Sequence, residues 1–154
     1  MNKFAKKYWD EFWAGKEKPE NVVAEQFGME NTPMADELAG LIVQGKKTAT
    51  CSNHALYAHY NLPLPAVGGY TIILNSDDKP VCIIRTNSME IIPMNKVTEE
   101  FAAAEGEGDL SYQYWYNGHK KYFTREMEEI GQSFAEDMLL VCEKFELVDV
   151  KNNG

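Results

Sequence analysis

A short basic and hydroxyl-rich segment is the first candidate for chemistry in this chain. Lys47, Thr48 and Thr50 follow Gly45 and place one ammonium and two hydroxyl groups within four residues. The segment is not a P-loop, because the glycine at the required distance before the lysine is absent and no strand leads into it. The alternative is structural, with Lys47 on the surface and the threonines as ordinary strand residues.

A glycine-spaced acidic segment is the second candidate. Glu105, Glu107 and Asp109 alternate with Gly106 and Gly108. Such a pattern is costly as structure alone, since glycine loses much chain entropy on folding and neighbouring carboxylates repel one another. The spacing does not match an EF-hand, and we expect no metal here. The alternative is that Asp109 caps a helix and the glycines end the preceding one.

Aromatic residues and cysteines supply further candidates. Trp115 and His119 are one helical turn apart and could form a wall against which a base stacks, although core packing explains the tryptophan equally well. Three cysteines at wide spacing predict buried thiols, with a catalytic Cys51 as the alternative. A tyrosine- and histidine-rich stretch after the lysine motif could border the same site; it contains His54, Tyr57, His59 and Tyr60.

The elements that would position these residues begin with two helices. Aromatic residues at helical spacing predict an amphipathic helix from Phe4 to about Gly15. Residues 16–33 are predicted to be mainly an irregular crossing segment, without regular secondary structure, between this helix and the next. A second helix is predicted from Met34 to Gly45, followed by a strand over residues 47–51.

Strands and helices then follow in blocks. Strands are predicted over residues 70–74, 81–86, 89–94 and 138–148, with a hairpin connection at 75–80. A helix capped by Thr98 should run to Glu105, and residues 110–119 and 124–131 look helical. The irregular order of helices and strands predicts an α+β fold with a mostly antiparallel β-barrel.

Composition limits the partners. A chain of 154 residues with 44% hydrophobic residues can bury one core, and no apolar run is long enough to span a bilayer or form a signal core. We expect a cytoplasmic protein without membrane contact. The net charge of -9 argues against general DNA or RNA binding, although small basic clusters remain at residues 3–7, 46–47 and 119–121.

Taken in order, these motifs resemble the longer bacterial type of the ASCH-domain family, a PUA-like family. The resemblance runs from about Ala35 to Val148 and rests on ordered motifs: Gly45-x-Lys47-Thr48-x-Thr50, Leu62-Pro63 and Gly68, Val97-Thr98-x-x-Phe101-Ala102-x-x-Glu105-Gly106-Glu107-Gly108-Asp109, then Trp115, His119, Phe123, Phe134, Glu143 and Phe145. It implies a PUA-like mixed, mostly antiparallel β-barrel surrounded by α-helices. Residues 34–150 would form this domain, and residues 1–33 an aromatic helix and connecting segment packed on it.

The resemblance also implies activity on RNA or its components. One branch of the family hydrolyses the amide of N4-acetylcytidine with a Lys, a Thr and a Glu, which correspond to Lys47, Thr50 and Glu105. A hydroxyl needs a base, and a lysine serves if burial or another cation lowers its pKa, whereas a glutamate needs a raised pKa to act as an acid. Residues three apart in a strand face opposite sides, so Lys47 must precede the strand or lie at a bulge to meet Thr50.

The predicted function is a metal-independent, cofactor-free hydrolase of a modified nucleoside or small RNA-derived substrate. The alternatives are a non-catalytic RNA-binding module and a single-strand ribonuclease. Beside the catalytic residues, we expect a substrate-binding set of Thr48, Ser52, Glu107, Asp109, Trp115 and His119. The partner would be a small nucleoside-like ligand or single-stranded RNA, and the sequence gives no oligomeric state.

Overall fold

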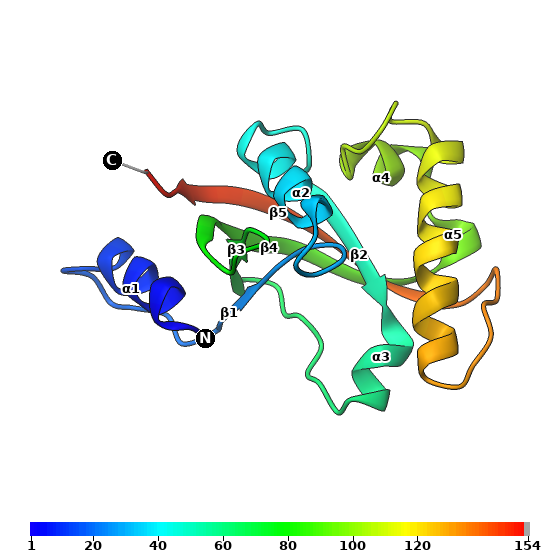
Figure 1. Cartoon of the computed structure of the whole chain (residues 1–154), viewed down its shortest axis with the longest axis horizontal. Helices are drawn as coiled ribbons and strands as arrows, with labels where there is room; N and C mark the ends of the chain where they lie inside the picture. The colour runs from blue at the N-terminus through cyan, green and yellow to red at the C-terminus, as the bar shows by residue number, and fades with distance from the viewer. Residues whose placement is uncertain (153–154) are drawn as a thin grey trace.

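The computed structural model describes residues 1–152 (Figure 1). Its helices are α1 (Lys3–Phe12), α2 (Pro33–Val43), α3 (His54–His59), α4 (Glu99–Ala104) and α5 (Tyr112–Glu129), with a 3-10 turn at Met94–Lys96. Its strands are β1 (Val22–Glu25), β2 (Ala49–Asn53), β3 (Tyr70–Leu74), β4 (Pro80–Pro93) and β5 (Leu139–Val150). This mixture confirms the predicted α+β class.

One sheet contains all of these strands in the order β1-β3-β4-β5-β2. The β1–β3 pair is parallel and the other pairs are antiparallel, which agrees with the prediction of a mostly antiparallel sheet. The predicted barrel is wrong, because β1 and β2 are opposite edges of an open sheet. The cleft described below is lined by Glu25 of β1 and Thr50 of β2, and it occupies the gap that barrel closure would have removed.

Two helices cover the two faces of the sheet. In β3, Ile72 and Leu74 pack against α1, whereas Ile73 between them packs against α2. Successive side chains of a strand point to opposite faces, so this alternation places the two helices on opposite sides. Helix α1 is held there by buried Tyr8 and Trp9, and the Tyr8 hydroxyl donates to Asp149 at 2.7 Å.

The last two helices form a third core with the ends of β2, β4 and β5. Phe101 and Ala102 of α4 pack with Trp115 and Phe123 of α5. Thr98 caps α4 as predicted, since its hydroxyl accepts from the Phe101 amide. Helix α5 lies across the ends of the long strands (Figure 1). Residues on one of its faces line the cleft described below.

Several local predictions need correction. Residues 22–25 form β1 instead of an irregular crossing, because the short strand pairs with β3 and its pattern is too brief to recognise alone. The His- and Tyr-rich stretch contains α3, capped by Asn53. The two helical segments predicted after residue 110 are one helix, since Lys120 to Phe123 continue the helical spacing without a break. No helix within residues 1–152 combines the length and apolar character needed to cross a membrane.

Removal of the Trp9 side chain tests whether α1 is integral to the fold. Trp9 is 3% exposed, so Trp9→Ala should reduce the free energy of unfolding by about 3–5 kcal/mol. Urea unfolding followed by circular dichroism measures the change. Lys7→Ala, on the exposed side of α1, should stay within about 0.5 kcal/mol of wild type. Equal effects of the two changes would mean that α1 does not contribute to the core.

Candidate functional site

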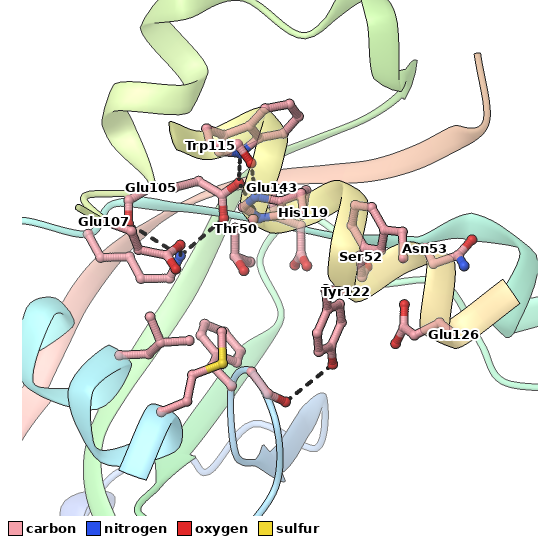
Figure 2. Close-up of a pocket in the computed structure, with 18 of the residues that line it drawn as sticks. Thr50, Ser52, Asn53, Glu105, Glu107, Trp115, His119, Tyr122, Glu126 and Glu143 are labelled. Atoms are coloured by element: carbon pink, nitrogen blue, oxygen red, sulfur yellow. Dashed lines mark hydrogen bonds and ion pairs between the residues drawn. The ribbon is translucent and has the colours of Figure 1, made fainter. Parts of the chain in front are cut away.

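A cleft of about 500 Å³ lies between the two edge strands and one face of α5 (Figure 2). Lys47, Thr50 and Glu105 all line it, although they come from different parts of the chain. Its walls also contain the loop after β1 and the start of α2. The further lining residues used below are Glu25, Cys51, Ser52, Asn53, Glu107, Trp115, His119, Tyr122, Glu126 and Glu143.

Lys47 reaches the cleft from the connection between α2 and β2. Its amide donates to the Leu41 carbonyl at the end of α2, and β2 begins two residues later at Ala49. This agrees with the prediction that Lys47 must precede the strand to converge with Thr50. The Lys47 side chain is 1% exposed, and its Nζ lies 3.1 Å from Glu105 Oε1 and 3.4 Å from Glu107 Oε2.

Glu105 is the centre of the polar contacts in the cleft. It follows α4 directly, and its side chain is 2% exposed. Lys47 contacts Oε1, whereas Oε2 accepts hydrogen bonds from the Trp115 indole and from the Cys51 thiol at 3.2 Å. His119 Nε2 lies 3.3 Å from the same Oε2. A carboxylate with this many donors retains its charge despite burial.

Close contact between the loop after α4 and the loop before β2 brings Lys47 and Glu105 together. Gly106 has φ +75°, and a Cβ on it would lie 2.2 Å from the carbonyl oxygen of Lys46. The Thr48 amide donates to the Ala104 carbonyl at 2.8 Å, which joins the same loops from the other side. Gly106, the first glycine of the acidic segment, is therefore required because its backbone lies against the backbone of the loop that contains Lys46 and Lys47.

The protonation states differ from those required for a lysine base and a glutamic acid. Burial alone would lower the pKa of Lys47, but Glu105 and Glu107 raise it above its ordinary value. Burial alone would raise the pKa of Glu105, yet Lys47 and His119 lower it to about 2. In the resting cleft Lys47 is thus an ammonium and Glu105 a carboxylate, which reverses the expected roles.

Hydrogen-bond geometry also assigns the protons of His119. Its Nδ1 lies 2.7 Å from the Trp115 carbonyl oxygen, which can only accept. Its Nε2 faces the Glu105 carboxylate, which also accepts, so both nitrogens must carry protons. Burial disfavours this charge, but the hydrogen bond to Glu105 prevails and raises the pKa of His119. The ring stacks on Trp115 with centroids 4.6 Å apart, which fixes its orientation.

Thr50 is placed by strand pairing. It lies opposite Glu143 in the β2–β5 ladder, and directly opposed side chains have Cβ atoms about 5 Å apart on the same face. Burial raises the pKa of Glu143, and a hydrogen bond from Thr86 partly offsets the rise. Glu143 is consequently the carboxylate with an elevated pKa next to the predicted nucleophile.

The predicted substrate-binding residues divide into two groups. Ser52, Glu107, Trp115 and His119 line the cleft, and the Ser52 hydroxyl lies 2.7 Å from that of Tyr57. Thr48 and Asp109 are exposed and are not among the lining residues. The Thr48 hydroxyl contacts the Ala104 carbonyl, whereas Asp109 accepts from the Ser111 amide just before α5. Their positions favour the structural alternative for these two residues.

Sequence reasoning missed a second group of lining residues. Glu25 lies in the unrecognised strand β1, and Asn53 lies at the end of β2, where only strand pairing brings it to the cleft. Tyr122 and Glu126 continue the helical spacing of Trp115 and His119 on α5. That periodicity was a usable signal, because i+3 and i+4 positions share one helix face.

One trio in the cleft has donor atoms close enough to hold a metal ion. Those of Cys51, Glu105 and His119 all lie within 4.8 Å of one another. A divalent cation would have to replace the hydrogen bonds that these groups already make around Glu105 Oε2. It would also lie beside the Lys47 ammonium, so the arrangement fits a proton-sharing cluster better than a metal centre.

Comparisons with known proteins agree on one family. A family model described as the ASCH domain matches residues 23–149. The structure of an ASCH domain from Lactobacillus crispatus JV V101 is similar with a TM-score of 0.90 and 35% identity, covering 97% of this chain and 96% of that one. A protein from Enterococcus faecalis V583 gives a TM-score of 0.85 and 41% identity, with 97% and 91% covered. No curated protein matched the sequence.

A Cβ at position 106 should disturb the site through the backbone. Gly106→Ala should cost about 2–5 kcal/mol of unfolding free energy, because alanine disfavours a positive φ and would collide with the Lys46 carbonyl. Thermal and urea unfolding measure the loss. Gly40→Ala provides the control, since a Cβ there in α2 meets nothing within 4 Å and should stabilise by about 0.5–1 kcal/mol. A near-neutral Gly106→Ala would contradict the close contact.

The charge on His119 should be visible by NMR. Its titration midpoint should lie above the ordinary value of 6.5 in wild type and be lower in Glu105→Gln than in wild type, because burial then acts without the Glu105 carboxylate. Because the folded-state pKa is raised, the stability from this pair should be complete below pH 6.5 and be lost as pH rises through the folded-state pKa. Glu128→Gln, an exposed change on α5, should leave the midpoint unchanged. An unchanged midpoint in Glu105→Gln would disprove the pairing.

Proposed function

The chain belongs to the ASCH domain family, and from this premise we propose that it is a metal-independent hydrolase acting on the amide of a modified nucleoside, such as N4-acetylcytidine. The observation that carries the proposal is the convergence of Lys47, Thr50 and Glu105 in one cleft. Two fully buried opposite charges are costly to desolvate, and a hydrophobic pair of similar volume is often at least as stable. Retention of the ionic pair beside a threonine on a cleft wall therefore supports a catalytic role.

The charges suggest how acyl transfer would begin. Thr50 Oγ1 attacks the acyl carbon, and its proton passes to Glu143, whose raised pKa suits a base. The oxyanion that forms on the former carbonyl is stabilised by the Lys47 ammonium. Glu105 holds that ammonium in place and does not itself transfer a proton, because its pKa is too low.

Release of the amine and of the acyl group would use His119. Its imidazolium gives a proton to the leaving nitrogen, after which the neutral ring accepts one from the water that hydrolyses the threonine ester. The carbon–nitrogen bond breaks in the first half of the reaction. In the second half, attack of water breaks the bond between the acyl carbon and Thr50 Oγ1, and Glu143 returns its proton to that oxygen. One water is consumed, and the products are the amine and a carboxylic acid. The same residues return to their starting protonation states.

The lining of the cleft favours a small substrate without phosphate over RNA. Within residues 1–152 it includes six glutamates, at positions 25, 30, 105, 107, 126 and 143, against Lys47 and His119 as basic groups. Both basic groups are already engaged with Glu105. A polyanion gains affinity mainly from basic residues that neutralise its phosphates, and this cleft offers few. The ribonuclease and RNA-binding alternatives are weaker for that reason.

Hydrolysis of acylated nucleosides tests the proposal. Wild type should release cytidine from N4-acetylcytidine, as followed by chromatography. Thr50→Ala should reduce kcat/KM by more than about 10³-fold, and Lys47→Met by about 10²–10³-fold, because they remove the nucleophile and the oxyanion partner. Glu143→Gln should cost about 10²–10⁴-fold through loss of the base.

A matched control separates chemistry from surface charge. Lys46→Met changes the exposed neighbour of Lys47 and should keep wild-type activity. No product from any acylated nucleoside, together with cleavage of single-stranded RNA that Lys47→Met abolishes, would replace the proposal with the ribonuclease reading. No turnover of either substrate would favour the binding module.

A further inference from the structure

Asn53 and Glu126 lie at the end of the cleft away from Glu105 and Glu107 (Figure 2). Asn53 is 1% exposed, and its Oδ1 accepts from the Ala55 amide. Its Nδ2 donates to the sulfur of Met127 at 3.3 Å, a weak acceptor. A buried amide with so poor a partner is unusual, since buried polar groups are normally well satisfied.

Glu126 is incompletely satisfied as well. Its Oε1 is buried, and within residues 1–152 no group forms a hydrogen bond to it. Burial and the nearby Glu129 raise the pKa of Glu126 to about 7, and hydrogen-bonding interaction with Tyr122 and Asn53 partly offsets the rise, although neither of them donates to Oε1. A buried carboxylate without a full set of donors costs free energy that a bound donor would recover.

The surrounding charges define what that donor can be. Glu25, whose side chain is exposed, and the partly buried Glu143 also line the cleft, and burial raises the pKa of Glu143. Among the described lining residues, the basic groups Lys47 and His119 are both at the Glu105 end. A phosphate or carboxylate would therefore meet only like charge at the Glu126 end. Hydroxyl or N–H groups fit, because they donate to a carboxylate without carrying negative charge.

Helix geometry gives the separation between the two ends. His119 and Glu126 are seven residues apart on one face of α5, which corresponds to ~10 Å along the helix axis. Tyr122 lies between them on the same wall. This length is comparable to that of a nucleoside from its exocyclic amine to its ribose hydroxyls.

We propose that Glu126 and Asn53 form a ribose subsite, in which the Glu126 carboxylate accepts hydrogen bonds from the 2′- and 3′-hydroxyls and the Asn53 amide donates to one of them. The subsite rests on the proposed function, since it orients the acyl amide toward Lys47 and Thr50 at the other end. It makes the cleft selective for an unphosphorylated ribonucleoside over the free base and over the nucleotide.

Calorimetric titration of reaction products tests the subsite without requiring turnover. Wild type should bind cytidine roughly 10-fold or more tightly than 2′,3′-dideoxycytidine, because the latter lacks the hydroxyls that reach the carboxylate. Cytosine should resemble the dideoxynucleoside, and cytidine 5′-monophosphate should bind more weakly than cytidine. Glu126→Gln should reduce the preference for cytidine over dideoxycytidine at least several-fold and leave dideoxycytidine affinity unchanged, because the amide keeps only one of the two acceptor oxygens.

The controls make the outcome specific. Glu128→Gln removes an exposed charge from the same helix and should change neither affinity. Equal binding of the two nucleosides by wild type, an equal loss for both in Glu126→Gln, or no binding of cytidine at millimolar concentration would overturn the subsite. Selective cytidine binding that depends on Glu126, in a protein that hydrolyses no nucleoside amide, would support the subsite and refute the proposed function.

Discussion

The buried ion pair between Lys47 and Glu105 is the interaction on which the arrangement of the site depends. Removal of each charge from water costs several kcal/mol, and only oppositely charged or hydrogen-bonding groups in close contact offset that desolvation penalty. Lys47 has two carboxylates and a backbone carbonyl near its Nζ, whereas Glu105 also receives the indole, the thiol and the imidazolium. Satisfying both requires the loop after α4 to touch the loop before β2, which leaves room only for glycine at position 106.

The open sheet keeps two further carboxylates of the cleft in contact with the cleft space. Glu143 is partly buried beside the cleft, and burial raises its pKa, whereas the side chain of Glu25 on the edge strand β1 is still exposed. Closure of the sheet through pairing of β1 with β2 would bury these carboxylates further without supplying new side-chain donors. The edges stay apart, and α5 covers the gap with Trp115, His119 and Tyr122. The helix thus acts as a wall of the site as well as a part of the core.

How much the sequence could predict depended on whether the signal was local. Helix spacing, the Thr98 cap and the long strands were visible because they are set by neighbouring residues. The approach of Lys47 to Glu105 was predicted only from the family motifs. The two residues are 58 positions apart, and no helix or strand periodicity relates residues at that separation. Glu143 and Asn53 were not recognised as lining residues, because their positions follow from the β2–β5 register. The prediction of a closed barrel was wrong, because the number and order of strands do not determine whether the two edge strands pair with each other.

The two ends of the cleft differ in how their charges are balanced, and this difference gives the site a direction. At one end, two cations and two carboxylates, Lys47, His119, Glu105 and Glu107, cancel within hydrogen-bond distance. At the other, Glu126 keeps a buried oxygen to which no group in the described part of the chain, residues 1–152, donates. A folded protein retains such a deficit only where the remaining structure supports it, and local strain of this kind is typical of binding sites. A ligand that donates at the Glu126 end and presents a carbonyl at the Lys47 end would satisfy both at once, whereas a carbonyl presented to Glu126 would leave its buried oxygen without a donor.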